Sequence, residues 1–168
     1  MENIKIALLG QPNSGKSTLF NGLTGSNQRV GNWPGKTVEK IEGKFSYKGT
    51  DYNIVDLPGA YGLSANSDEE VITREYIASG EADLIAVMAD ASQLNRSLFM
   101  LSDYAGIDIP VVLIVNMMDI AESQGKTIDI KGLQNSLNIP VLPIVAADKK
   151  EYKALYDFLE NTNKGNIL

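Results

Sequence analysis

Short apolar runs alternate with helical patterns along this chain of 168 residues. Continuous apolar runs predict buried strands at 4–9, 84–88, 111–115 and 141–145. Apolar residues that recur at three- and four-residue spacing predict helices at 17–23, 67–79, 92–105, 128–137 and 150–160. Strands that alternate with helices are typical of an α/β fold, in which helices cover both faces of a mostly parallel sheet.

Apolar and polar residues alternate in the segments 38–48 and 52–55, which meet at Lys48-Gly49-Thr50-Asp51. This arrangement predicts a hairpin, and hence a six-stranded sheet with one antiparallel edge strand. Just before it, residues 25–36 are rich in Gly, Asn and Pro and predict an exposed loop. Trp33, the single tryptophan, lies on that loop. We therefore expect it to be exposed, although tryptophan more often lies in a core.

Composition points to one domain without thiol or imidazole chemistry. The length suits a single domain, expected at 1–162 with a tail at 163–168. Cys and His are absent, which removes thiolates and the commonest general base. A net charge of −6 disfavours nucleic acid or anionic lipid as the main partner. No apolar run reaches the ~20 residues of a membrane span and no export signal opens the chain, so we expect a cytoplasmic location.

Residues 10–17 read Gly-Gln-Pro-Asn-Ser-Gly-Lys-Ser, a complete G-x-x-x-x-G-K-S phosphate loop between a predicted strand and a predicted helix. Its glycines let backbone N–H groups approach phosphate oxygens. Lys16 would reach the terminal phosphates, and Ser17 would offer its hydroxyl to Mg2+. A chance turn is the alternative, which the strand and helix context disfavours. The expected nucleotide-binding residues of this segment are Gly10, Asn13, Ser14, Gly15, Lys16, Ser17 and Thr18.

Two further segments suit a γ-phosphate and its metal ion. Asp56-Leu57-Pro58-Gly59 follows an apolar strand, so Asp56 could reach Mg2+ through a water and the Gly59 N–H could meet the γ-phosphate. Thr37 lies between this motif and the phosphate loop, and it could give Mg2+ a second hydroxyl and the γ-phosphate a backbone N–H. The alternatives are an Asp-initiated turn and a threonine that starts a strand at Val38. Loops ordered by such contacts form a nucleotide switch.

A candidate base site follows the strand at 111–115, where the chain reads Asn116-Met117-Met118-Asp119. The Asp119 carboxylate can accept hydrogen bonds from guanine N1–H and N2–H2 together, a pairing that adenine cannot supply. Asn116 can brace the loop. A capping Asn and Asp around a turn is the alternative. The wrong base would leave buried polar groups unpaired, so discrimination should be strong.

The motifs together resemble the translation-factor (TRAFAC) class of P-loop GTPases. The match narrows to the GTPase domain of the prokaryotic ferrous iron transport protein B family, FeoB. The similar segments are 10–21, 27–35, 37–39, 56–61, 90–96 and 116–119, and Gly31-Asn-Trp-Pro-Gly35 is the most family-specific. The resemblance implies a P-loop NTPase fold of the Ras-like G-domain type. It also implies a cytoplasmic module that regulates a membrane region passing Fe2+; that region and its helical spacer are absent from these residues.

The resemblance also makes the base site look loose. Met117 stands where most GTPases have a lysine that covers the base, a change the family tolerates. A Ser-Ala-Lys-like element is expected near the last strand, but the chain has Val145 and Ala146 there. Only the Ala146 N–H then suits guanine O6. We expect modest GDP affinity and fast release. Lys36 occupies a position that is usually apolar in the family.

Catalysis should be slow, because Ala60 occupies the position at which Ras-like enzymes place a water-orienting glutamine. No obvious cis arginine finger is present. The resemblance suggests that Asn13 helps bind K+ between the phosphates, which would replace the finger's charge; a turn-stabilising Asn13 is the alternative. The expected catalytic residues are Lys16, Asn13, Thr37 and Gly59. The expected metal ligands are Ser17, Thr37 and Asp56 for Mg2+ and Asn13 for K+.

Three readings of function compete. The first is a GTPase switch whose partners are guanine nucleotide and the rest of an iron transporter, with the isolated domain soluble and weak self-association left open. The second is a nucleic-acid-associated GTPase of the ribosome-assembly or tRNA-modification kind, which the charge and the 31–35 sequence disfavour. The third is an interaction module with negligible turnover, which Ala60 keeps open.

Overall fold

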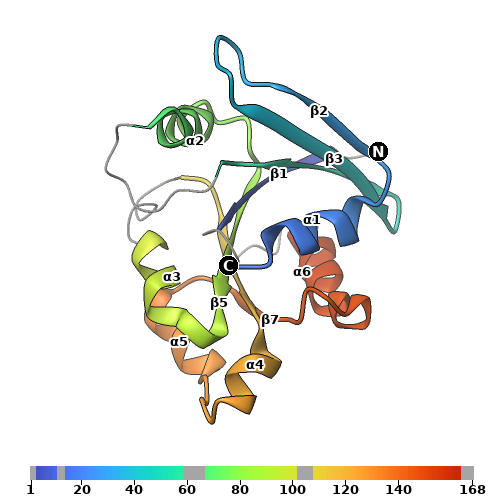
Figure 1. Cartoon of the computed structure of the whole chain (residues 1–168). Helices are drawn as coiled ribbons and strands as arrows, with labels where there is room; N and C mark the ends of the chain where they lie inside the picture. Colours follow the sequence, from blue (N-terminus) through green and yellow to red (C-terminus); the bar gives the residue numbers. More distant parts are fainter. Residues whose placement is uncertain (1–2, 11–13, 59–66, 102–107, 164–168) are drawn as a thin grey trace.

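The computed structural model describes residues 3–10, 14–58, 67–101 and 108–163. In these residues, helices cover both faces of a seven-stranded sheet (Figure 1). The strands are β1 (Asn3–Gly10), β2 (Gln28–Asn32), β3 (Glu39–Tyr47), β4 (Thr50–Asp56), β5 (Leu84–Asp90), β6 (Val111–Asn116) and β7 (Val141–Pro143). The α-helices are α1 (Lys16–Thr24), α2 (Asp68–Ala78), α3 (Leu94–Leu101), α4 (Met118–Ser123), α5 (Ile130–Leu137) and α6 (Lys153–Asn163). Short 3-10 helices, η1 (Ala91–Gln93) and η3 (Lys149–Tyr152), precede α3 and α6.

The strand order is β2-β3-β4-β1-β5-β6-β7. Only β3 runs against its neighbours, because it pairs antiparallel with both β2 and β4 while the remaining pairs are parallel. The predicted hairpin is confirmed: Tyr47 pairs with Thr50 across Lys48 and Gly49. Both turn residues have positive φ, of 48° and 82°, as a two-residue turn between twisted strands requires.

The prediction of six strands was wrong by one, because β2 lies inside the segment expected to be a loop. All five residues of β2 are exposed, so burial imposes no alternation on its sequence. Its one apolar residue, Val30, is 61% exposed. Backbone pairing with β3 alone makes it a strand. Such pairing leaves no trace in a hydrophobic pattern.

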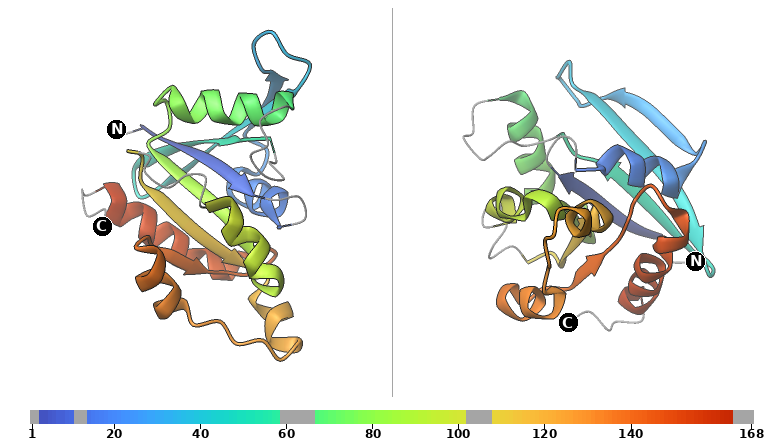
Figure 2. Two further views of the ribbon diagram at one scale, coloured as in Figure 1. Left: turned by 90° about the vertical axis from the view of Figure 1, so that its left-hand side faces the viewer. Right: turned by 60° about the horizontal axis from the view of Figure 1, so that its bottom comes forward.

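Two apolar cores lie on the two faces of the sheet, because successive side chains of a strand point to opposite sides. On β1, Ile6 and Leu8 join the core beneath α1 and α6, while Ala7 and Leu9 join the core beneath α2, α3 and α5. Figures 1 and 2 show the same division, with α1 and α6 together on one side of the sheet. The continuous apolar runs of the inner strands follow from burial on both faces.

Trp33 is buried, so the prediction that it would be exposed was wrong. Only 6% of the residue is accessible. Its ring meets Tyr76 of α2 edge-on, with ring centroids 5.6 Å apart, and Lys40 Nζ lies 4.8 Å from the ring centroid. A large apolar ring gains more from packing on α2 than from water, even when its backbone belongs to a connecting segment.

Smaller differences concern element ends. The predicted strand at 141–145 is shorter, ending at Pro143, and α4 was not predicted. The helix predicted at 150–160 divides into η3 and α6, which continues to Asn163, the first residue assigned to the tail. Residues 102–105, the last part of the helix predicted at 92–105, lie outside the described residues. Among the helices that the structure describes, none is long and apolar enough to span a membrane.

Candidate nucleotide-binding site

The sequence motifs meet at one edge of the sheet because parallel strands end together. Gly10 is the last residue of β1, Asp56 the last of β4 and Asn116 the last of β6. The pairing register sets Leu8 beside Asp56 and Asp90 beside Asn116. Ligands of open α/β sheets bind at this carboxyl edge. The fold therefore gathers motifs that are about a hundred residues apart in the chain.

The phosphate loop enters α1 through a residue that only glycine suits. Gly15 is the N-cap of α1 and has φ of +93°. A Cβ at this position would lie 2.0 Å from Asn116 Nδ2. Ser17 and Thr18 follow in the first turn and are exposed, while Ser14 is buried. The exposed helix start leaves backbone N–H groups free for an anion. Asn13 lies outside the described residues.

Lys16 and Asp56 form an ion pair at the centre of the site. Lys16 Nζ lies 2.9 Å from Asp56 Oδ1 and donates a hydrogen bond to the Leu57 carbonyl at 2.6 Å. Asp56 Oδ1 is buried, and no aligned hydrogen-bond donor reaches it from the described residues. The Asp56 carboxylate, at the end of β4, and the exposed Ser17 hydroxyl, in the first turn of α1, are oxygen ligands of the type that a hard cation prefers. These two residues therefore fit Mg2+.

Asn116 fastens the phosphate loop to the segment after β7. Its Nδ2 donates to the Ser14 carbonyl at 2.9 Å, and its Oδ1 accepts from the Ala146 N–H at 2.7 Å. The residue is only 4% exposed. The bracing role expected for Asn116 is present. The assignment of the Ala146 N–H to guanine O6 does not fit this geometry, because Asn116 already uses that donor. Val145 beside it is half-buried.

The turn from β6 into α4 places Asp119. Met117 is the N-cap of α4, with φ of 63° and ψ of 34°. A left-handed conformation at a non-glycine residue costs roughly 1–2 kcal/mol, and such strain concentrates at binding sites. The sharp turn sets Asp119 in the first turn of α4, where its side chain is exposed. Its carboxylate is thus free to meet a base.

Thr37 is not brought to the phosphate loop. It is exposed in the connection between β2 and β3, and this connection extends away from the start of α1 in Figure 1. Lys36 beside it forms an ion pair with Asp68 of α2 at 3.3 Å, which gives the unusual lysine a partner. Gly59 and Ala60 lie outside the described residues. Thr73 Oγ1 donates to the Pro58 carbonyl at 3.2 Å, so α2 contacts the segment that leads to them.

No sequence signal points to one further residue at this edge. Tyr152, in η3, donates its hydroxyl hydrogen to the Ala146 carbonyl at 2.6 Å. Its spacing in the chain is that of an ordinary core residue. Only the folded chain shows that it touches the segment bound by Asn116.

Comparison with known proteins agrees with this geometry. The family model for ferrous iron transport protein B matches residues 4–159. The chain belongs to the FeoB family. The Fe(2+) transporter FeoB of Escherichia coli K12 is 46% identical over 159 residues, which cover 92% of this chain and 21% of that protein. The chain thus spans about a fifth of the length of the curated relatives that it matches.

Solved FeoB structures match the G-domain fold. The G domain of T. maritima FeoB has a TM-score of 0.85 at 40% identity, covering 96% of this chain and 99% of that one. The cytosolic domain of the same transporter in a GDP form has a TM-score of 0.93 at 39% identity, covering all of this chain and 66% of that one. The GMPPNP form of that cytosolic domain has a TM-score of 0.92 at 40% identity, and the match covers 98% of this chain and 66% of that one. The chain is therefore a FeoB N-terminal G domain with the expected α/β fold.

Proposed function

We propose that this chain binds GTP and GDP with Mg2+, hydrolyses GTP slowly, and regulates ferrous iron transport by its nucleotide state. The observation that carries the proposal is the Asn116 bridge, which joins the phosphate loop at Ser14 to the loop at Ala146 beside the exposed Asp119. Such a bridge suits a ligand that has phosphates at one end and a base at the other. GDP and GMPPNP forms of the T. maritima relative support it.

Direct titration tests this function. A fluorescent GDP should bind the wild-type domain in the presence of Mg2+ and be displaced by GTP and GDP but not by ATP. The physical reason is that Asp119 can pair with guanine N1–H and N2–H2, which adenine lacks. Displacement by ATP at the same concentration would contradict a guanine site. Removal of Mg2+ with a chelator should lower the affinity for GTP more than the affinity for GDP, since the γ-phosphate adds negative charge.

Nucleotide binding must break the ion pair of Lys16 with Asp56. The ammonium would turn to the terminal phosphates, and the Asp56 carboxylate would then be free to hold Mg2+ together with Ser17 and, after closure of its loop, Thr37. Mg2+, when bound, supplies positive charge that neutralises the phosphates. Lys16 and the Gly59 N–H would stabilise charge on the γ-phosphate.

Potassium is proposed to supply the charge that an arginine finger supplies elsewhere, with Asn13 as its side-chain ligand. GTP turnover should then be several-fold faster in KCl than in NaCl for the wild type. Asn13→Ala should abolish the difference. Equal rates in all four conditions would contradict the role of K+ while leaving GTP binding intact. In either salt the rate should be slow, because Ala60 cannot orient water through its side chain.

The base site is proposed to release GDP quickly. Met117 replaces a base-covering lysine, and the Ala146 N–H is engaged by Asn116, so few groups remain to hold the base. Stopped-flow release of fluorescent GDP should be complete within seconds. Release over many minutes would contradict this proposal.

The regulatory role concerns the whole transporter, with the domain on the cytoplasmic side of the membrane. A full-length protein carrying Lys16→Ala should lose nucleotide-dependent iron uptake, because Lys16 carries positive charge to the phosphates. Unchanged uptake would contradict the switch. The nucleic-acid alternative is disfavoured by the net charge of −6 and by membership of the FeoB family.

A further inference from the structure

A buried tyrosine holds the segment after β7 that Asn116 joins to the phosphate loop. Tyr152 is 2% exposed, as is Ala146, and the tyrosine hydroxyl donates to the Ala146 carbonyl at 2.6 Å. Burial raises the pKa of the Tyr152 hydroxyl, with a further contribution from nearby Tyr156. The hydroxyl therefore keeps its proton and stays a donor at neutral pH. Without it, a buried carbonyl would lose its partner, which is costly.

Ala146 is fixed from both sides. Its carbonyl accepts from Tyr152, and its N–H donates to Asn116 Oδ1 at 2.7 Å. Asn116 Nδ2 in turn donates to the Ser14 carbonyl at 2.9 Å. One continuous chain of buried hydrogen bonds therefore runs from η3 to the phosphate loop. A change at its outer end alters the orientation of the Ala146 peptide groups and the support of Asn116.

Helix α1 leaves room for both side chains of this hydrogen-bonded chain. A Cβ at Gly22 would lie 2.2 Å from the Tyr152 hydroxyl oxygen, and a Cβ at Gly15 would lie 2.0 Å from Asn116 Nδ2. Glycine inside a helix lowers its stability. Gly22 lies in the interior of α1, and its position is explained by the space that Tyr152 needs.

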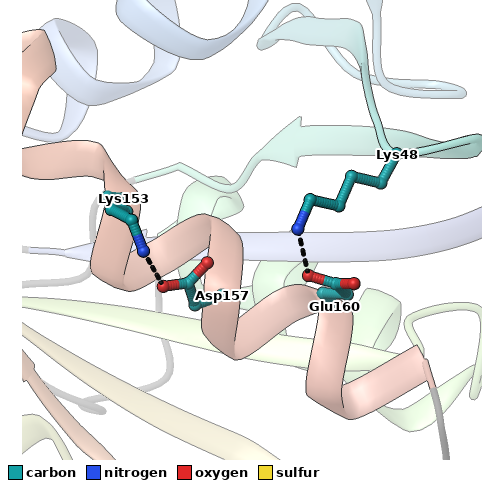
Figure 3. Close-up of polar contacts among 4 residues, drawn as sticks. All are labelled: Lys48, Lys153, Asp157 and Glu160. Carbon is teal, nitrogen blue, oxygen red and sulfur yellow. Dashed lines mark hydrogen bonds and ion pairs between the residues drawn. The ribbon is translucent and has the colours of Figure 1, made fainter.

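The helix that follows Tyr152 is itself anchored, and the Tyr152 ring meets Tyr156 of that helix edge-on with centroids 6.3 Å apart. Lys48, in the β3–β4 turn, pairs with Glu160 at 3.1 Å, and Lys153 pairs with Asp157 at 2.8 Å (Figure 3). The rings of Tyr47 and Tyr156 stack with centroids 4.7 Å apart. The exposed ion pairs contribute little stability singly. The Lys48–Glu160 pair and the stacked rings of Tyr47 and Tyr156 join α6 to the β3–β4 hairpin, whereas the Lys153–Asp157 pair lies within α6. Tyr152 directly precedes this anchored helix.

We propose that Tyr152 is a positioning residue for the guanine-binding loop, and that its hydrogen bond to Ala146 slows GDP release. The inference rests on the proposed guanine-nucleotide site. Tyr152 touches no ligand; it acts through Ala146 and Asn116. Its loss should therefore weaken the hold on the base more than the hold on the phosphates, because Ser14 of the phosphate loop lies two hydrogen bonds further along the chain than Ala146.

The test is Tyr152→Phe, which removes one hydroxyl and keeps the ring. Stopped-flow release of fluorescent GDP should become about five- to tenfold faster, the effect of one lost hydrogen bond. Tyr156→Phe is the matched control, since it removes the hydroxyl of the next tyrosine along the chain, in α6, which is not the donor to Ala146. Its release rate should stay within twofold of wild type. A GDP release rate of Tyr152→Phe within twofold of the wild-type rate would overturn the proposal.

Two readouts separate positioning from general damage to the fold. In Tyr152→Phe, KM for GTP should rise while the single-turnover rate at saturating GTP stays within twofold. The affinity for inorganic triphosphate, which has no base, should fall less in Tyr152→Phe than the affinity for GDP does; both are measured by competition against fluorescent GDP. A single-turnover rate that falls as much as GDP release accelerates, or a loss of triphosphate affinity as large as the loss of GDP affinity, would overturn the proposal.

The outcome also distinguishes this inference from the proposed function. If the wild type fails to bind fluorescent GDP, the nucleotide site itself is refuted. If it binds and Tyr152→Phe releases at the wild-type rate, only the inference is refuted. Gly22→Ala provides a second variant, because its methyl group displaces the hydroxyl while alanine favours the helix. It should also accelerate release, and an unchanged rate would contradict the proposal independently.

Discussion

Glycine is required at position 15 for two separate reasons, its backbone conformation and the closeness of a neighbouring side chain. The φ of +93° favours glycine, and Asn116 Nδ2 occupies the place of a Cβ. Gly25, at the other end of α1, has φ of +57° but nothing within 4 Å of a Cβ. The two glycines therefore separate conformational strain from steric collision.

We expect Gly15→Ala to lower the free energy of unfolding by about 3 kcal/mol or more and to abolish GDP binding, since the methyl group displaces the amide that fixes the phosphate loop. Gly25→Ala should also lose about 1–3 kcal/mol, because φ of 57° with ψ of −123° strains any residue other than glycine, but it should keep GDP binding. Urea unfolding and GDP titration measure both effects. Loss of GDP binding in both variants would contradict a specific collision with Asn116.

At the residue scale, Asp119 is the proposed determinant of base recognition. Asp119→Asn should weaken GDP binding strongly and strengthen the binding of xanthosine diphosphate, whose C2 carbonyl can accept a hydrogen bond from the new amide. Glu122→Gln, on the next turn of α4, removes a similar exposed charge and should leave the preference unchanged. Competition titrations with the two nucleotides give the result. A preference for guanine retained in Asp119→Asn would place the base elsewhere.

At the scale of elements, α2 holds the connection between β2 and β3. Trp33 packs edge-on against Tyr76, and Lys36 pairs with Asp68. Both contacts keep the segment that carries Thr37 on α2. If Thr37 meets the phosphates as proposed, this segment has to move, and we expect Trp33 to leave Tyr76 in the same event.

Trp33 fluorescence should report that event. The nucleotide-free protein should emit at the short wavelength of a buried indole, and GMPPNP with Mg2+ should shift emission to longer wavelength. GDP should have little effect, since it lacks the γ-phosphate that Thr37 would contact. Trp33 is the single tryptophan, so no other residue contributes. Identical spectra in the three states would refute coupled closure.

At the scale of the whole molecule, buried tyrosines predict alkaline instability. Burial, with the charges of Glu81, Glu42 and Asp83, raises the pKa of Tyr76 from 10.0 to about 12. Below pH 10 both folded and unfolded forms keep the proton. Above it the unfolded chain ionises first, so the stability that the neutral form contributes is lost from pH 10 to about 12.

The free energy of unfolding should therefore fall across this range, by about 1–2 kcal/mol from Tyr76 after allowance for partial solvation. Tyr76→Phe should flatten the fall, although the raised pKa values of Tyr152 and Tyr156 act in the same direction. Urea unfolding at pH 9 to 12 compares the two proteins. If the free energy of unfolding falls equally with pH in both proteins, Tyr76 does not contribute to the loss of stability.

Prediction from sequence succeeded where the residues that determine a structure lie within one segment of the chain. The inner strands are apolar because both faces are covered, and the phosphate loop is defined by its own glycines, lysine and serine. It failed where the cause is a distant neighbour. The strand β2 exists by backbone pairing with β3, and Trp33 is buried by α2. The donor on Ala146 is engaged by a side chain thirty residues away.

The sequence by itself therefore determined the fold class, the family resemblance and the edge at which phosphate and base motifs gather. These follow from local patterns and from the rule that parallel strands end together. Only the tertiary structure decided which groups touch there. It paired Lys16 with Asp56, turned the Ala146 N–H toward Asn116, and set Tyr152 over Gly22. Each of these contacts joins segments whose separation is fixed by packing, which no local pattern encodes.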